Sequence, residues 1–327
     1  MGTYKFIKKQ NPGLQNTIVM GPWTHGRWNL LSGGSEDLGV FPFSGTRAYF
    51  QEKIELPFFN YYLKGKGPLN LPEAVVFETG TDQWKTYDAW PPAEATEKTL
   101  FFRNSGRLAF EPTPDSLRAG FDEYVSDPAK PVPYTMQIYS MQNSLGYYRQ
   151  YFVEDQRFAA SRPDVSVYTS EPLAENMTIT GPITAEIYVS TTGTDADWVV
   201  KVIDVYPDDV ADPRNNPMNI RMGGYQRLVR GDICRGKFRN SFEKPEPFIP
   251  GRVTRIAFEL PDVQHTFLKG HRIMIQVQSS WFPLFDRNPQ TFCNIRTARE
   301  TDFRKAAHRI YHTARYPSAI TLRVLAK

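Results

Sequence analysis

The chain has 327 residues and a formal net charge of +4, with 40% hydrophobic and 23% charged residues. These values are typical of a folded globular protein, and they exclude a disordered or collagen-like chain. Lysines and arginines are scattered among acidic residues without forming a basic stripe, so the composition gives no support to nucleic-acid binding. At this length we expect one large domain or two unequal domains.

The first 67 residues combine helical and strand patterns. Residues 3–11 (TYKFIKKQN) are typical of the end of an amphipathic helix, and the apolar run 17–20 (TIVM) predicts a short buried strand. A loop, GPWTHG, follows over 21–26. Residues 46–63 carry helical periodicity, and we expect Pro57 to kink or divide that helix.

The pattern changes after residues 64–68 (KGKGP), which have the composition of a linker. Short apolar segments then follow one another between turns, and several alternate with period two, as half-buried strands do. The expected strands are 73–79, 99–103, 165–169, 183–190, 198–206, 253–260, 271–278 and 319–325. So many strands without long intervening helices indicate a β-sandwich or jelly roll. We therefore predict two domains, 1–67 and 68–327.

No apolar run approaches the roughly 18 residues that a membrane-spanning helix needs, so we expect no transmembrane segment. The first residues, MGTYK, contain no apolar signal core.

His25 is the strongest candidate for a catalytic residue. It lies in the loop directly after a predicted strand, and the carboxyl ends of strands are where open α/β sheets bind ligands. The pKa of a histidine lies near working pH, which suits a general base. On position alone, a structural role beside Trp23 stays open.

The loop Gly21-Pro22-Trp23-Thr24-His25 resembles the loop that carries the triad histidine in the cocaine esterase and X-Pro dipeptidyl-peptidase superfamily. The resemblance covers nearly the whole chain, and it is strongest to the α-amino acid ester hydrolases and glutaryl acylases. The further motifs that carry it are PFFxxYLK at 57–64, DQR at 155–157, SRPDV at 161–165, TDADWVVK at 194–201, GHR at 270–272 and SSWFP at 279–283.

This resemblance implies a mainly β fold. It consists of a C-terminal jelly roll of the galactose-binding-like type, preceded by the last strand and helices of an α/β-hydrolase domain. It also implies a Ser-His-Asp triad in which His25 takes and returns the proton of the serine.

The other two members of that triad are not recognisable in the chain. In α/β-hydrolases the order is serine, aspartate, histidine, so both would precede His25. No serine here has glycine two residues before and two residues after it, and the first acidic residue is Glu36. We therefore expect a missing N-terminal hydrolase segment or another chain to supply both groups, and we expect this chain alone to be inactive.

The resemblance implies a substrate that is a small ester, an amide or a short peptide. We expect no cofactor, no metal and no nucleic-acid partner. A homo-oligomer and an exported or periplasmic location are weaker implications. The rival hypothesis is a jelly-roll module that binds a carbohydrate or another ligand without catalysis.

Metal binding is the alternative weighed for two groups of side chains. His308 and His312 are four residues apart, but no third ligand is evident nearby. The resemblance gives no catalytic role to these residues or to His265 and His271, and we favour structural roles for them. An acidic stretch could suit calcium, although strand-edge and turn charges are the preferred interpretation. Its members are Asp195, Asp197, Asp204, Asp208, Asp209 and Asp212.

Aromatic residues near the C-terminus and the two cysteines have open roles. Trp281, Phe282 and Phe285 could line the active-site cleft, but we favour packing, and the tyrosine-rich loop 147–151 has the same ambiguity. Cys234 and Cys293 are expected to be free thiols, with a single disulfide as the alternative and a cysteine nucleophile for His25 disfavoured. The sequon at 176–178 (NMT) is too short a pattern to carry weight.

Overall fold

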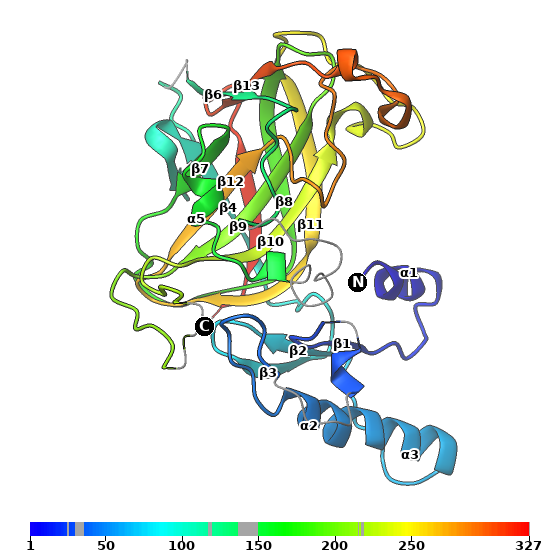
Figure 1. Ribbon diagram of the computed structural model, residues 1–327. Helices are drawn as coiled ribbons and strands as arrows, with labels where there is room; N and C mark the ends of the chain where they lie inside the picture. Colours follow the sequence, from blue (N-terminus) through cyan, green and yellow to red (C-terminus); the bar gives the residue numbers. More distant parts are fainter. Residues whose placement is uncertain are drawn as a thin grey trace.

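The computed structural model describes residues 1–24, 26–29, 36–116, 120–136, 150–214, 216 and 219–326. Figure 1 shows a large β structure above a small sheet, with helices α2 and α3 below that sheet and α1 to one side. The chain is mainly β, with 36% of its residues in strands and 16% in helices, as the sequence predicts. Within the described ranges, no helix is both long and apolar enough to cross a membrane.

The helices of the N-terminal region follow the predicted pattern. They are α1 (Gly2–Gln10), the short 3-10 helix η1 (Arg27–Asn29), α2 (Thr46–Phe50), the π-helical segment η2 (Gln51–Glu55) and α3 (Leu56–Lys64). The helix predicted over 46–63 is therefore present. Its π-helical segment ends just before α3, which carries Pro57 at its start, so the helix is divided where the missing N–H of proline removes an interior hydrogen bond.

A three-stranded sheet forms the centre of this region. Strand β1 (Ile18–Met20) pairs in parallel with β2 (Ala74–Glu78), and β2 pairs antiparallel with β3 (Gln83–Tyr87). All five residues of β2 are buried, which explains its continuous apolar sequence AVVFE. Since β2 and β3 come after the predicted linker, the small sheet unites residues from both sides of it.

The remaining strands form one large sheet. Its order is β10-β9-β12-β7-β5-β4-β14-β8-β13-β6, and β11 pairs with β8 outside this path. The strands are β4 (Thr96–Arg103), β5 (Arg107–Ala109), β6 (Phe121–Ser126), β7 (Val165–Thr169), β8 (Met177–Thr191), β9 (Asp197–Val205), β10 (Gln226–Arg235), β11 (Thr254–Phe267), β12 (Arg272–Gln278), β13 (Ala306–Tyr311) and β14 (Ala319–Val324). Short helical segments connect them: η3 (Asn104–Gly106), η5 (Gln150–Phe152), α5 (Arg157–Ala160), η6 (Gly236–Phe238), η7 (Ile295–Thr297) and η8 (Glu300–Asp302).

All eight strands predicted after the linker are present, although β8 begins six residues earlier and β11 ends seven residues later than predicted. Strands β3, β5, β6, β10 and β13 were not predicted. They have several polar or charged side chains and partly exposed faces, so their periodicity is weak.

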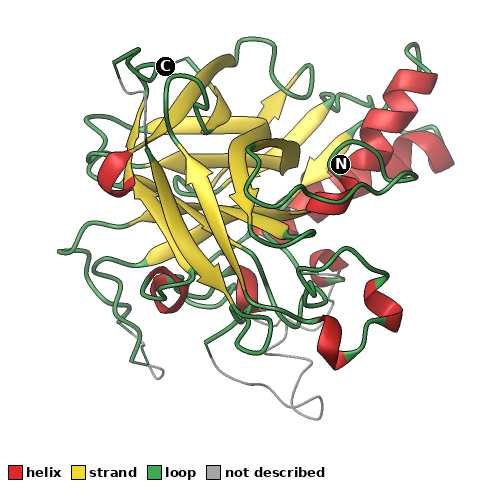
Figure 2. Ribbon diagram, turned by 90° about the horizontal axis from the view of Figure 1, so that it is seen from above, coloured by secondary structure: helices red, strands yellow, loops and turns green. Residues whose placement is uncertain are grey.

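The largest apolar cluster of the described residues lies inside the jelly roll. Side chains reach it from strands near one end of the sheet path, such as Trp198 of β9 and Ile275 of β12, and from strands near the other end, such as Ile187 of β8 and Ile320 of β14. Because both ends of the path contribute to one core, the sheet folds over on itself as a sandwich (Figure 2).

The sandwich is not closed between β10 and β11. Within the described residues β10 forms a ladder with β9 alone and β11 with β8 alone, and these two strands approach each other without a ladder between them. In this part of the chain the free edge of β10 therefore faces an edge of β11 that is bridged only by Thr79, on the side of the small sheet. This opening positions the cavity described below.

Candidate functional site

His25 itself lies outside the described residues, and its side chain is not placed. Its loop is placed through residues 21–24, which leave the carboxyl end of β1. The position of the loop relative to the strand is thus the one that the sequence predicts for a catalytic histidine.

Trp23 anchors this loop to helix α2. Its indole N–H donates to Thr46 Oγ1 at 2.9 Å, and the N–H and hydroxyl of Thr46 both donate to Glu36 Oε2, at 2.7 and 2.6 Å. The Trp23 ring also packs against Phe50 and Trp84. The loop is therefore held by side chains from the start of α2 and from β3.

Gly21 is required for this arrangement. A Cβ atom at position 21 would lie 2.3 Å from the Trp23 ring, closer than two carbon atoms can approach. The glycine at the head of the GPWTH motif thus allows Trp23 to fold back over the backbone.

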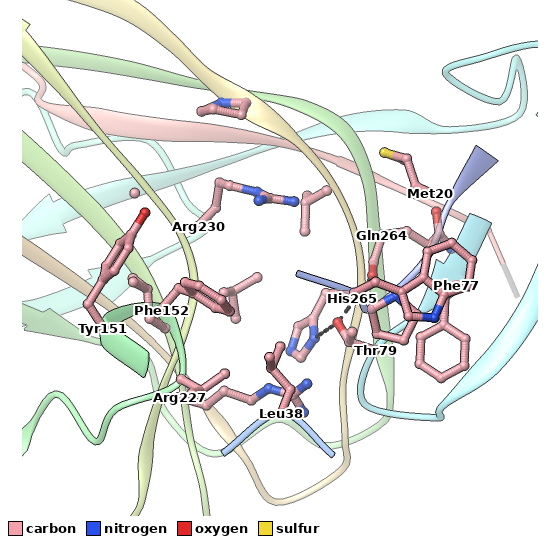
Figure 3. Close-up of a pocket in the computed structure, with 18 of the residues that line it drawn as sticks. Met20, Leu38, Phe77, Thr79, Tyr151, Phe152, Arg227, Arg230, Gln264 and His265 are labelled. Atoms are coloured by element: carbon pink, nitrogen blue, oxygen red, sulfur yellow. Dashed lines mark hydrogen bonds between the residues drawn. The ribbon is translucent and has the colours of Figure 1, made fainter. Parts of the chain in front are cut away.

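A cavity of about 500 Å³ lies beside this loop, between β10 and β11 (Figure 3). Its wall combines the small sheet, the loop and the jelly roll. The lining residues include Met20, Gly21, Pro22 and Trp23 from β1 and its loop, Arg227 to Asp232 from β10, Pro261 and Val263 to His265 from β11, and Trp281, Leu284 and Phe285. This volume suits a small-molecule ligand.

Two arginines of β10 bring positive charge to the cavity. Arg230 has a buried Nε atom without a hydrogen-bond partner within the described residues. The guanidinium of Arg227 is held by the Tyr206 hydroxyl at 3.3 Å and stacks over the Phe41 ring, with its carbon 4.0 Å from the ring centre. Sequence reasoning missed both residues, because β10 was not recognised as a strand.

A buried carboxylate joins two histidines at the edge of this cavity. Asp204 contacts His271 Nδ1 at 2.8 Å and His265 Nε2 at 3.3 Å, and Thr79 lies 2.8 Å from His265 Nδ1. Burial lowers the pKa of His265, while hydrogen bonds from the two histidines hold the pKa of Asp204 below its usual value against the opposing effect of its own burial. The structural roles predicted for His265 and His271 agree with this network, which connects β9, β11, β12 and the end of β2.

Lys201 lies on the outer face of β9, close to the aromatic wall of the cavity. Its side chain is fully buried, donates to Gln156 Oε1 at 3.0 Å and has its Nζ atom 5.0 Å from the centre of the Trp281 ring. Burial lowers the pKa of this amine to about 7, with Glu154 opposing the shift. A lysine inside the apolar run WVVKVIDV was visible in the sequence, but its partners were not.

The structure supports no metal site at the candidates named from the sequence. His308 and His312 lie on strand β13 and just after it rather than on one helix face, and only His312 has a carboxylate neighbour, Asp122 at 3.2 Å. No cluster of three or more potential metal ligands occurs in the described residues. Burial lowers the pKa of His308 to about 3.

Two carboxylates of the acidic stretch, those of Asp195 and Asp197, have protein partners. Asp197 accepts from Asn288 at 2.7 Å and lies 3.3 Å from Arg235, while Asp195 accepts the backbone N–H groups of Ala196 and Lys237. Burial raises the pKa of Asp197 to about 6. These carboxylates therefore fix the start of β9 against η6 and the 288–290 segment.

The structure also shows where the aromatic residues near the C-terminus lie, for which packing and lining of a cleft were the two alternatives. Trp281 is buried against Val199, Ile203 and Met274 and at the same time lines the cavity, so packing and cleft roles coincide there. Phe285 also lines the cavity, whereas 38% of Phe282 is exposed. Most of loop 147–151 lies outside the described residues.

Cys234 and Cys293 are free, and burial raises the pKa of Cys234 to about 12, which makes it a poor nucleophile.

Fold and site together define a jelly-roll domain that walls one side of a cavity beside the loop that follows β1. Residues 69–321 match the family of X-Pro dipeptidyl-peptidase C-terminal non-catalytic domains, and the chain belongs to this family. The resemblance seen in the sequence to the C-terminal part of the cocaine esterase and X-Pro dipeptidyl-peptidase superfamily is thereby confirmed.

Similar proteins of known structure include an aminopeptidase from a marine sediment archaeon, Thaumarchaeota archaeon, with 43% identity and a TM-score of 0.90, and an α-amino acid ester hydrolase with 40% identity and a TM-score of 0.88. Each alignment covers 99% of this chain and 52% of the other chain. Cocaine esterase of a Rhodococcus species is 28% identical over 94% of this chain and 51% of its own length. The chain thus spans about half the length of these relatives.

Proposed function

We propose that this chain is the C-terminal portion of a serine hydrolase that cleaves esters or amides, with His25 as the general base. The observation that carries the proposal is the cavity at the carboxyl end of β1, which is walled by the His25 loop on one side and by the jelly roll on the other. The family assignment supports the β-domain as a non-catalytic part of such a hydrolase.

In the proposed reaction, a serine outside this chain attacks the acyl carbon and His25 accepts the serine proton. His25 then returns this proton to the leaving alcohol or amine, and an aspartate outside this chain orients the imidazole throughout. Water hydrolyses the acyl-enzyme in a second half-reaction with the same proton transfers. The jelly roll contributes Trp281, Phe285 and the β10 edge as a wall that limits water and shapes the substrate site.

Two features of the N-terminal region support a further hydrolase portion. Within the described residues β1 pairs only with β2, so one edge of β1 has unsatisfied backbone groups that another strand would pair. Helix α3 also exposes several large apolar side chains. They are Leu56, Phe58, Phe59, Tyr61, Tyr62 and Leu63. An apolar face of this kind is typical of a surface that packs against another part of a protein.

The names of the relatives favour ester or peptide-amide substrates, since they are an aminopeptidase, an α-amino acid ester hydrolase and a cocaine esterase. The rival carbohydrate-binding module receives less support. The strongly exposed aromatic residues of the described jelly roll are phenylalanines on separate segments: Phe110, Phe121, Phe242, Phe282 and Phe292.

A fluorophosphonate probe, which labels activated serines, tests this proposal. We expect no labelling of the 327-residue chain alone. We expect stoichiometric labelling when the part of the α-amino acid ester hydrolase that this chain does not cover is fused before residue 1, and we expect that labelling to slow strongly in His25→Ala. Rapid labelling of the chain alone would place a nucleophile within these residues and would contradict the proposal.

A further inference from the structure

We propose that Arg230, assisted by Arg227, binds a carboxylate carried by the substrate and thereby selects which esters or amides are cleaved. This inference rests on the proposed function, because it places the substrate in the cavity beside the His25 loop. The two arginines project from the unpaired edge strand β10, and Figure 3 shows their side chains extending across the cavity in the direction of Gln264 and His265.

One nitrogen of the Arg230 guanidinium lacks a protein partner. Its Nε atom is buried and has no hydrogen bond within the described residues. Burying a cation is costly unless its lost hydration is compensated. Burial lowers the pKa of Arg230, and attraction to Asp262 and Tyr151 opposes this shift only in part. An anion entering the cavity would add to this compensation.

Asp262 of β11 and Asp232 of β10 both have hydrogen-bond partners other than Arg230. Asp262 accepts from Lys5 Nζ at 2.7 Å with one oxygen and from the Trp90 indole at 2.9 Å with the other. Asp232 accepts the Ile233 backbone N–H at 2.7 Å. Asp262 attracts Arg230 electrostatically, but neither of these hydrogen-bond contacts involves Arg230, so its Nε–H remains available to a ligand.

Arg227 adds a second positive charge on the same strand. Its guanidinium is held in place by Tyr206 and Phe41, neither of which neutralises it. Together with burial, the charge of Arg227 lowers the pKa of His265, which lines the same cavity. The two guanidinium groups therefore favour an anion on their side of the cavity.

The lining indicates the class of anion. A guanidinium offers a planar pair of N–H donors that matches a carboxylate. Asp232 on the same wall adds a negative charge that disfavours a doubly charged phosphate. Trp281 and Phe285 supply an apolar surface for the body of the ligand. The fitting ligand is a monocarboxylate with an aromatic or aliphatic body.

Equilibrium binding to the 327-residue chain tests this site without any need for activity. The probes are N-acetylphenylalanine and its neutral twin N-acetylphenylalaninamide, measured by ligand-observed NMR titration. We expect the acid to bind at least about tenfold more tightly than the amide, because charge-assisted hydrogen bonds are roughly twice as strong as neutral ones. Arg230→Gln should abolish this preference, Arg230→Lys should retain part of it, and the exposed control Arg252→Gln should leave it unchanged.

A second experiment distinguishes two partners for Arg230. One is a carboxylate of the substrate, and the other is a carboxylate side chain of the hydrolase portion. In the fused enzyme described above, N-acetylphenylalanine should inhibit ester hydrolysis competitively, the amide should inhibit at least about tenfold less, and Arg230→Gln should equalise the two. Binding to the chain without inhibition of the fused enzyme would assign Arg230 to a protein interface and overturn the inference.

Equal binding of the two probes, or an acid preference that survives in Arg230→Gln, would also overturn it. If Arg230→Gln fails to fold, Arg230→Lys decides the question, because it keeps the charge but loses the paired donors. Failure of the proposed function has a different signature. In that case the carboxylate preference persists while the fused enzyme shows no turnover that depends on His25.

Discussion

The jelly roll and the N-terminal region of this protein bury their apolar residues to very different degrees. In the jelly roll, Trp198, Ile187 and Ile256 have no exposed surface. In α3, by contrast, 74% of Leu63 and 56% of Leu56 are exposed. The comparison shows that the apolar side chains of the β-domain are buried by the domain itself, whereas those of the first 67 residues are buried only in part within this chain.

The largest expected effect is the removal of a fully buried core side chain from the jelly roll. Trp198→Ala should lower the free energy of unfolding by about 3–5 kcal/mol, because it creates a large cavity between the two layers of the sandwich. The midpoint of urea unfolding measures this change. A loss below about 1 kcal/mol would show that β9 does not belong to a cooperative core.

The next effect concerns the pH dependence of that same core. Burial lowers the pKa of His308 to about 3, from an ordinary value of 6.5, and its ring lies against Trp198 and Tyr124. Between pH 6.5 and pH 3 the unfolded chain binds a proton that the folded chain does not. The stability contributed by the neutral His308 is therefore fully present above pH 6.5. It is lost as the pH falls from 6.5 toward 3, at about 1.4 kcal/mol per pH unit and by a few kcal/mol in total.

His308→Leu removes this titration. Urea unfolding at pH 7 and at pH 4.5 should show a smaller loss of stability on acidification in the variant than in the original protein. Identical pH dependence in the two proteins would mean that His308 is solvated or paired in the folded state.

A contact between the two regions should have an intermediate effect. Asp262 of β11 binds Lys5 of α1 and the indole of Trp90. Asp262→Ala should cost about 1–3 kcal/mol, because it leaves the buried Trp90 N–H without an acceptor. Lys5→Ala should cost less than about 1 kcal/mol, since 38% of the Lys5 side chain is exposed. Equal costs for the two variants would contradict this account of the contact.

The smallest effect is expected on α3. Leu63→Ala should change the free energy of unfolding of this chain by less than about 0.5 kcal/mol, because the side chain is largely exposed. In the fused enzyme the same change should cost measurably more, since the proposal has α3 packing against the hydrolase portion. The same small cost in both proteins would remove the exposed helix face as support for that proposal.

The strands with strong apolar patterns were predictable from the sequence. Alternation in 183–190 and the buried run in 198–206 led directly to β8 and β9. Strand β10 was not predictable in this way, because Arg227, Arg230 and Asp232 interrupt its apolar residues and one of its edges is unpaired.

The candidate site shows the same limit. The position of the GPWTH loop after β1 was predictable, since it depends on neighbouring residues. The cavity depends on β10, β11 and the segment around Trp281, which are separated in sequence and meet only in the folded chain. The pairing of Asp204 with two histidines likewise depends on the register of β9 against β12 and on the approach of β11.

Hydrolysis of p-nitrophenyl acetate tests the central claim most directly, with the 327-residue chain, the fused enzyme and the fused enzyme carrying His25→Ala measured side by side. The account predicts no turnover above the buffer rate for the chain alone. It also predicts turnover by the fused enzyme and a loss of at least about a thousandfold in kcat/KM in the variant, as for removal of a triad member. Turnover by the chain alone that disappears in His25→Ala, or a fused enzyme that does not depend on His25, would contradict it.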